Sequence, residues 1–181
     1  MDRVSAIQGQ FALLQDFANR NAAHVKGIAN SPDWAQIVMN LDDVPLVVGG
    51  TQSPRVSRTH TLTFRFGASY PAAPPVFSVG PDRPIGAHVW RNGTVCLLQH
   101  HWYPARELWS GVTDLIESLQ TGAQRMESVA DQDNSKWLRS ATNRNRLRAL
   151  VGTPTRFRVP IGFGIVTVER PPIATVHAGS R

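Results

Sequence analysis

The sequence predicts an α+β domain in which an antiparallel sheet is combined with helices that come first and last in the chain. Segments with helical periodicity occur near the N-terminus and beyond residue 110, and short segments with strand-like alternation lie between them. With 181 residues, of which 41% are apolar, the chain can bury one core of ordinary composition.

The chain has no long apolar segment and a single cysteine. No run approaches the roughly 18 apolar residues of a transmembrane helix, so no membrane span is expected. The N-terminal segment carries Asp2 and Arg3 and lacks an uninterrupted apolar core, so it does not predict a secretion signal. One cysteine cannot form an internal disulfide, which indicates a reducing, cytoplasmic location.

The first expected element is an amphipathic helix that ends near Asn19–Asn21. Apolar side chains recur there at spacings of three and four residues, which places them on one helical face. They are Val4, Ile7, Phe11, Leu14 and Ala18.

Four strands of an antiparallel meander are expected next, at residues 24–29, 34–41, 59–66 and 76–79. The third is the clearest, because Leu62, Phe64 and Phe66 alternate with polar residues as in a half-buried strand. A short additional piece is expected at 46–48, before a loop at 49–54.

Two helices are expected in the C-terminal half. Ser110 is the expected N-cap of the first, which runs to about Gly122. The second runs from about Ser135 to Leu150 and is ended by Gly152 and Pro154. Its apolar side is expected to consist of Trp137, Leu138, Ala141, Leu147 and Leu150.

The stretch from Tyr70 to Leu119 carries Cys96, the only cysteine. A proline elbow, Tyr70-Pro71-x-x-Pro74-Pro75, precedes it and turns the chain sharply, because proline fixes φ and restricts the residue before it. Residues 81–103 hold too many Gly and Pro residues for a helix, so an irregular but ordered loop is expected around Cys96.

The order of these motifs resembles the catalytic domain of the ubiquitin-conjugating enzymes. That domain runs Tyr-Pro-x-x-Pro-Pro, a loop with His-Pro-Asn, Asn-Gly-x-(Ile/Val)-Cys-Leu, Trp-x-Pro and a helix. The matching residues are 70–75, 92–97 and 102–104, followed by the helix near 112–119. The resemblance implies the fold of that family for residues 1–150: N-terminal helix, four-stranded antiparallel meander, catalytic loop and C-terminal helices. Residues 151–181 would be a basic, strand-like extension.

The resemblance also implies an acyl transfer through a thioester. Cys96, as thiolate, would accept a ubiquitin-like modifier from a separate ATP-dependent activating enzyme, and an amine of a target protein would then attack the thioester. No nucleotide-binding loop occurs in the sequence, and neither a cofactor nor a metal is expected. The implied partners are the modifier, the activating enzyme and the target.

The chain departs from the family where the oxyanion donor is expected. Gly86-Ala87-His88 replaces His-Pro-Asn, and His88 stands in the position of the Asn. An imidazole can donate a hydrogen bond, so His88 either stabilises the oxyanion or only braces the loop. Asn92 corresponds to the Asn of the family's Asn-Gly turn and is expected to shape the backbone.

Several further residues are supporting candidates. Leu98 replaces an Asp that is frequent in the family, and the shortened segment after Cys96 contains His100 and His101. These two could act as base, lysine guide or partner contact, or could be exposed polar groups of a loop. Trp102 belongs to the Trp-x-Pro motif. The acidic residue that orients the incoming lysine could be Glu127, Asp131 or Asp133.

These departures look similar to the divergent prokaryotic branch of the family, whose members sit in operons, some of which defend against phage. Three alternatives remain open. The first is a non-catalytic interaction module of the same fold. The second is a zinc site made of Cys96, His88, His100 and His101, although the usual paired spacing is missing. The third is binding of nucleic acid by the basic C-terminal third, which shows no known aromatic-basic motif, so nucleic acid is not expected as a partner.

The formal net charge of +6 arises from the C-terminal third of the chain. Residues 125–181 contain ten Lys and Arg against four Asp and Glu, whereas the first 124 residues are neutral. This predicts either a solvated basic surface or an acidic partner. Apolar residues alternate from Phe157 to Ile165, which predicts a strand that either packs on its own domain or joins a partner's sheet.

Overall fold

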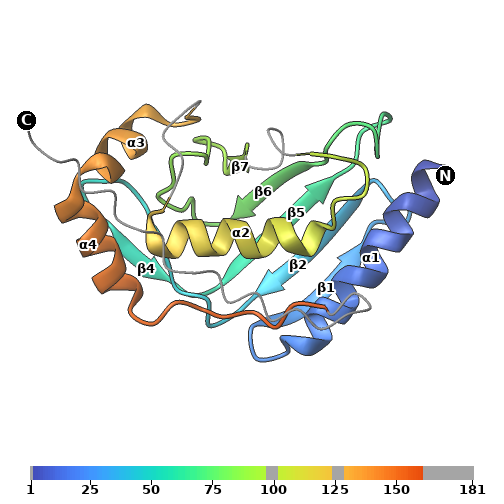
Figure 1. Cartoon of the computed structure of the whole chain (residues 1–181), viewed down its shortest axis with the longest axis horizontal. Helices are drawn as coiled ribbons and strands as arrows, with labels where there is room; N and C mark the ends of the chain where they lie inside the picture. Colours follow the sequence, from blue (N-terminus) through green and yellow to red (C-terminus); the bar gives the residue numbers. More distant parts are fainter. Residues whose placement is uncertain (1, 97–101, 124–128, 161–181) are drawn as a thin grey trace, which may run out of the picture.

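The computed structural model describes residues 2–96, 102–123 and 129–160, and within them the chain forms four helices and seven strands (Figure 1). In chain order these are α1 Arg3–Arg20, β1 Val25–Asn30, β2 Gln36–Leu41, β3 Leu46–Val48, β4 Arg55–Ser57, β5 His60–Arg65, β6 Val76–Gly80, β7 Thr94–Val95, α2 Leu108–Thr121, α3 Gln132–Arg139 and α4 Ala141–Val151. The expected α+β class is confirmed.

The main sheet has the strand order β1-β2-β5-β6-β7, and every neighbouring pair is antiparallel. Its first four strands are the meander expected from the sequence, and β7 adds a short edge strand that was not expected. The piece at 46–48 does form, but it pairs with β4 in a separate two-stranded sheet. Strand β4 was missed because three half-exposed residues are too short to show an alternating pattern.

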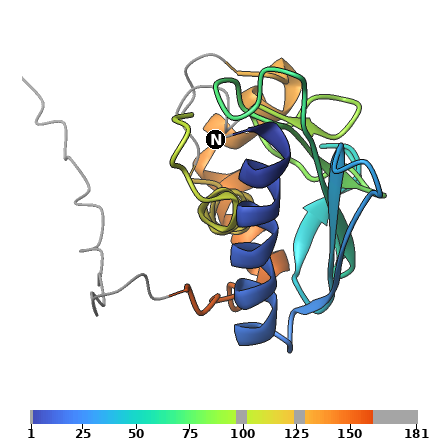
Figure 2. The ribbon, with the colours of Figure 1, turned by 90° about the vertical axis from the view of Figure 1, so that its right-hand side faces the viewer.

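Helices α1 and α2 lie on the same face of the main sheet, and among the described elements none covers the opposite face (Figure 2). The hydrophobic core lies between this face of the sheet and the two helices. Phe64 of β5 and Phe77 of β6 stack there with ring centroids 4.5 Å apart, and Phe17 of α1 packs against Trp109 of α2. The apolar helix residues that recur every three or four positions thus pack against the inward-facing side chains of the strands.

Helix α2 begins at Leu108, with Glu107 in the N-cap position, so the expectation that Ser110 caps it was wrong. Glu107 makes no side-chain capping bond. The N–H of Leu108 instead donates to Oε1 of Gln10 on α1, at 2.8 Å. A residue 98 positions away satisfies the helix terminus, which no local capping pattern could predict. Gly122 ends the helix in the left-handed conformation, as expected.

The expected single helix from 135 to 150 is two helices that break at Ser140. Ser140 has extended backbone angles, and its hydroxyl accepts the N–H of Asn143 as the N-cap of α4. Arg144 donates to the carbonyl oxygens of Leu138 and Arg139, which satisfies the end of α3. Leu150, expected on the apolar side, is exposed, and Val151 is buried instead.

A second, smaller core joins α3, α4 and β3 to the loop that precedes β7. Its buried members are Val47, Ile85, Ala87, Leu138, Leu147 and Val151. The loop residues Ile85 and Ala87 are therefore held by C-terminal helices and by the small sheet rather than by the main core.

After α4 the chain turns back along the ends of α1 and α2 (Figure 1). Asn21 donates to the carbonyl of Arg158 and accepts its N–H, at 2.8 and 2.7 Å, and the ring of Phe157 lies 5.3 Å from that of Phe17. The described part of the expected tail strand, residues 157–160, forms no strand, and the rest lies outside the described residues. The proposed boundary between 1–150 and 151–181 stays a prediction. Among the described helices, none is long and apolar enough to span a membrane.

Candidate active site

Cys96 follows directly on β7, and a tight turn before that strand sets its position. The N–H of Gly93 donates to the carbonyl of Trp90, and Asn92 Oδ1 accepts the N–H of Thr94 at 3.0 Å. Gly93 has a φ of +82°, and a Cβ at this position would clash with the carbonyl oxygen of Val79 on β6. Only glycine lets the turn approach β6 this closely, so the Asn-Gly pair determines where β7 and Cys96 lie.

Cys96 and His88 are in direct contact through both backbone and side chain. The N–H of Cys96 donates to the carbonyl of His88 at 3.0 Å, and Sγ lies 3.2 Å from Nδ1 of the imidazole. Both residues are nearly buried, with exposed fractions of 3% for Cys96 and 9% for His88. The structure thus brings together the two residues that the sequence singled out for catalysis.

Burial raises the pKa of the Cys96 thiol, because desolvation disfavours the thiolate, and a backbone hydrogen bond only partly counters this. The sulfur is therefore mainly protonated at neutral pH and needs a neighbour that can interact with its proton or its charge. His88 Nδ1 is placed to do so: in one tautomer it donates to the sulfur, and in the other it accepts from S–H.

Trp102 ties the chain after Cys96 to the proline elbow before it. Its indole Nε1 donates to the carbonyl of Pro71 at 2.8 Å, and its ring lies 5.7 Å from that of Tyr70. The Tyr70 hydroxyl is buried, and this desolvation raises its pKa to about 12. The Tyr-Pro and Trp-x-Pro motifs are thus the two halves of one contact that supports the cysteine loop.

Asp131 is held in the first turn of α3 rather than free to guide a substrate. It is 6% exposed, its Oδ1 accepts the N–H of Asn134, and its Oδ2 lies 2.6 Å from Nη1 of Arg83. Burial alone would raise the pKa of this carboxyl, but the bonds from Asn134 and Arg83 outweigh it and hold the pKa below its usual value. Asp133, by contrast, is well exposed.

Sequence reasoning missed Arg83 and Asn134, which contact Asp131 and the loop before His88. Asp131 before the helical segment was an available signal, since Asp is preferred at a helix N-cap, but no local pattern indicated the roles of Arg83 and Asn134. His100, His101 and Glu127 lie outside the described residues. Within residues 2–96, 102–123 and 129–160, no three His, Cys, Asp or Glu side chains group as metal ligands.

Comparison with protein-family models gives no match. Curated proteins do match: "Probable ubiquitin-conjugating enzyme E2 W" of Dictyostelium discoideum is 33% identical over 110 residues, which cover 59% of this chain and 71% of that protein. The chain belongs to the ubiquitin-conjugating enzyme family. This ubiquitin-conjugating enzyme has the Tyr-Pro, Asn-Gly-x-x-Cys and Trp-x-Pro motifs that suggested the family.

Two other relatives of this ubiquitin-conjugating enzyme match over shorter lengths. "Ubiquitin-conjugating enzyme E2 W" of Caenorhabditis elegans is 30% identical over 88 residues, 47% of this chain and 58% of that protein. "Probable ubiquitin-conjugating enzyme E2 W-A" of Danio rerio is 31% identical over 87 residues, 46% of this chain and 55% of that protein. All three relatives are eukaryotic, so they lend no support to the prokaryotic branch.

Solved structures agree with the ubiquitin-conjugating fold. The H. polymorpha ubiquitin conjugating enzyme Pex4p, crystallised with the soluble domain of Pex22p, superposes with a TM-score of 0.59 at 12% identity over 83% of this chain and 97% of that one. The enzyme UbcA1 of Agrocybe aegerita gives 0.50 at 21% identity over 77% of this chain and 94% of that one. At these identities the likeness concerns the fold.

Proposed function

We propose that Cys96 is the thioester carrier of this ubiquitin-conjugating enzyme, and that His88 assists the release of the modifier to an amine. The observation that carries this is the contact of 3.2 Å between Cys96 Sγ and His88 Nδ1, at the end of an edge strand in the expected fold. The sole thiol and the residue that replaces the family's Asn are neighbours.

In the first step, called charging below, the modifier moves from one sulfur to another. Cys96 Sγ attacks the carbonyl carbon of the thioester on the activating enzyme, and a new C–S bond forms. The old C–S bond breaks, and the leaving thiolate of the activating enzyme takes up the proton that Sγ gave up. A sulfur is bonded to the carbonyl before and after the step, so the exchange needs no redox partner or cofactor.

In the second step, called discharge below, an amine nitrogen attacks the same carbonyl. The tetrahedral intermediate carries a negative oxygen, which then re-forms the carbonyl as the bond to Sγ breaks. The proton that the amine nitrogen loses ends on the departing Sγ, which regenerates the Cys96 thiol. An N–H on Nδ1 of His88, within reach of the sulfur, can donate to that oxygen and to the departing thiolate. This is the role that the family assigns to the Asn of His-Pro-Asn.

The raised pKa of Cys96 suits a carrier more than a free nucleophile. A thiol with a high pKa is a poor leaving group, so its thioester resists water and stray thiols. Discharge then depends on groups that stabilise the intermediate, which gives the enzyme control over when the modifier is released.

The proposed partners are the modifier, the activating enzyme and the target. We further propose that the protein acts in a bacterial operon that defends against phage. That setting predicts genes for an activating enzyme and a modifier beside the gene for this chain. It also predicts that Cys96→Ala abolishes protection against phage in cells that carry the gene set, whereas unchanged protection would argue against it.

One observation favours a different function, a non-catalytic interaction module of the same fold. Cys96 is almost completely buried and its pKa is raised, as in a structural cysteine. Under this alternative, Cys96→Ser changes stability slightly and leaves partner binding and biological function intact.

The deciding experiment mixes the purified chain with ATP, an active activating enzyme and its modifier, and resolves the products without reductant. We expect a heavier band that disappears with reductant and in Cys96→Ala. Cys96→Ser should give a band that survives reductant, because an oxyester is not reducible by thiols. If wild type never charges while the activating enzyme charges itself, the carrier function is wrong and the interaction module is the better account.

A further inference from the structure

The N-terminal end of α3, from Ala130 to Asn134, is hydrogen-bonded to the backbone of the loop that ends at His88. The N–H groups of Ala130 and Asp131 both donate to the carbonyl of Ala87, at 2.8 and 3.2 Å. Nδ2 of Asn134 donates to the carbonyl of Gly86 at 3.3 Å. Two successive carbonyls of the Gly86-Ala87-His88 triplet are therefore fixed by one helix terminus, directly before the residue that contacts the cysteine.

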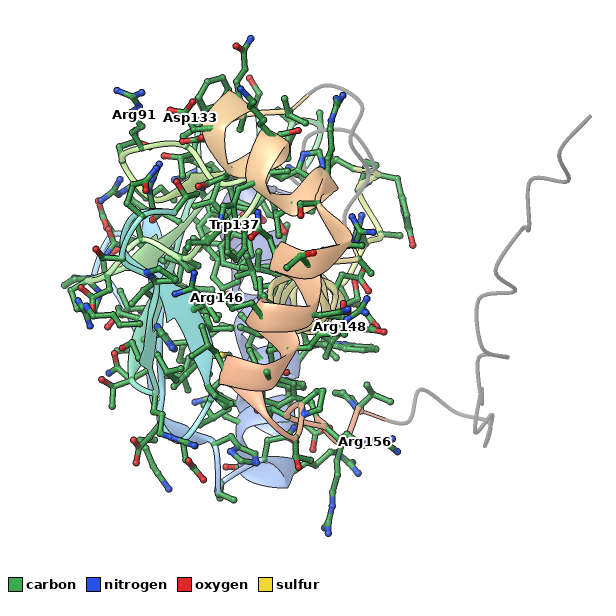
Figure 3. The ribbon with its side chains drawn as sticks, turned by 90° about the vertical axis from the view of Figure 1, so that its left-hand side faces the viewer. Arg91, Asp133, Trp137, Arg146, Arg148 and Arg156 are labelled. Carbon is green, nitrogen blue, oxygen red and sulfur yellow. The ribbon has the colours of Figure 1, made fainter. Side chains whose placement is uncertain are left out.

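Two Arg–Asp pairs join the same parts of the chain, and they differ sharply in burial. Arg83 and Asp131 are 2.6 Å apart, with side chains 26% and 6% exposed. Arg91 and Asp133 are 3.7 Å apart, with side chains 85% and 78% exposed. Figure 3 shows Arg91 beside Asp133, which lies in the first turn of α3. Water and salt screen an exposed pair of this kind, whereas the buried pair constrains the loop.

Asn134 is 1% exposed, and its Oδ1 has no hydrogen-bond partner among the described residues. An unsatisfied buried oxygen is unfavourable, and an apolar residue in its place would avoid that penalty. Within the described residues, only Nδ2 of the Asn134 amide is hydrogen-bonded, to the carbonyl of Gly86. The helix itself needs only the N-cap that Asp131 already provides.

The loop is also held in place by its packing in the second core. Ile85 and Ala87 are fully buried against Leu138 of α3 and residues of α4 and β3. The N–H of Ile85 also donates to the carbonyl of Val47 on β3, at 2.8 Å, so the first half of the loop is held by β3. The contacts from the start of α3 reach Gly86 and Ala87, directly before His88, and are therefore placed to set the position of that residue.

We propose that Asp131 and Asn134 are positioning residues that hold His88 against Cys96 for discharge of the modifier to an amine. They act through the loop backbone, by the contacts to Gly86, Ala87 and Arg83, and touch neither the sulfur nor the substrate. The inference rests on the proposed function of Cys96 and His88. It assigns Asp131 a role different from direct guidance of the lysine.

The test measures charging and discharge separately in three variants. Asp131→Asn keeps an N-cap acceptor but removes the charge that pairs with Arg83. Asn134→Asp keeps the size and removes the donor to Gly86. The new carboxylate is favoured by the helix dipole but is buried, so folding of this variant is checked first. Asp43→Asn removes the exposed partner of Arg58, outside the candidate active site, and is the matched control.

We expect the maximal rate of discharge to free lysine to fall on the order of 10-fold to 100-fold in Asp131→Asn and Asn134→Asp, as for a slightly misplaced catalytic group. The lysine concentration for half-maximal rate and the rate of charging should stay within about twofold, since neither residue contacts substrate. Asp43→Asn should behave as wild type.

The decisive comparison places the same changes in a His88→Ala background. A residue that acts only through His88 loses its effect there, so the double variants should discharge no more slowly than His88→Ala alone. An equal further loss would overturn the proposal and leave a purely structural role, and so would wild-type discharge in both single variants. Failure of wild type to charge would instead reject the proposed function. If Asn134→Asp does not fold, Asp131→Asn decides alone, and a folded Asp131→Asn that discharges normally rejects the proposal.

Discussion

Sγ of Cys96 lies 3.2 Å from Nδ1 of His88, and the backbone N–H of the cysteine donates to the carbonyl of the histidine at 3.0 Å. The two residues are eight positions apart in sequence, with turn and strand between them, and the double link fixes sulfur and imidazole relative to each other. Because the ring can donate to the sulfur or to an oxygen next to it, this pair is where a donor other than the family's Asn would act.

Replacement of His88 by Ala should slow discharge to free lysine on the order of 10²-fold, the effect of losing one oxyanion donor. Charging should slow only a few-fold, because one sulfur replaces another. Single-turnover gels of each step give both rates. His88→Asn should restore much of the discharge rate, and equal losses in both steps would exclude the donor role. His100→Ala and His101→Ala, measured alongside, test the other histidines as base or lysine guide.

The thiol of Cys96 should react slowly and with a shifted pH dependence. Burial raises its pKa, so the thiolate fraction at pH 8 is smaller than in an unfolded chain. Iodoacetamide should label the folded protein more slowly, with a rate that still rises at a pH where the urea-unfolded chain has levelled off. The chain has one cysteine, so total label reports this site alone. Equal pH profiles in both states would contradict the raised pKa.

Stability should decrease between neutral and mildly acidic pH because of His60. This ring is 2% exposed, its Nε2 bonds the carbonyls of Val44 and Ser57, and burial lowers its pKa. Its contribution is complete above the unfolded value of about 6.5 and is lost as the pH falls through the lower folded value.

Thermal unfolding at pH 7.5 and 5.5 measures this difference, and His60→Gln should flatten it. An unchanged slope in His60→Gln would assign the pH dependence to other groups. Asp131, whose pKa is also lowered, contributes in a separate window, because its stabilisation is lost only below its unfolded value of about 3.9.

Gly93→Ala should disturb the active loop as well as the fold. A side chain at a φ of +82° is strained, and the new Cβ would meet the carbonyl of Val79, so the turn before β7 must move. We expect a loss of stability of roughly 1–3 kcal/mol and slower charging through displacement of Cys96. Gly50→Ala, where an added Cβ meets nothing within 4 Å, is the control. Urea unfolding and charging assays that are unchanged in Gly93→Ala would show that the turn does not place the cysteine.

Local patterns predicted α1 and the four strands of the meander. These elements alternate polar and apolar residues with the period of their own structure, so the burial of one side against a core could be inferred without knowing the partner. The start of α2 and the break at Ser140 could not be inferred in this way. Gln10 caps α2 from a distant part of the chain, and Arg144 closes α3 from the next helix.

The sequence by itself determined the family, because the Tyr-Pro, Asn-Gly-x-x-Cys and Trp-x-Pro motifs follow each other in the family's order. It also predicted Cys96 and His88 as the candidate pair, since His88 stands where the family has Asn. It left Asp131 as one of three acidic candidates. Only the tertiary structure decided that Asp131 is buried against Arg83 and that Asn134 holds Gly86, since residues 48 positions apart meet only when α3 packs beside the loop. The sequence gives the charge of a carboxylate, but packing decides whether it is surrounded by water or, as for Asp131, buried beside a partly exposed guanidinium.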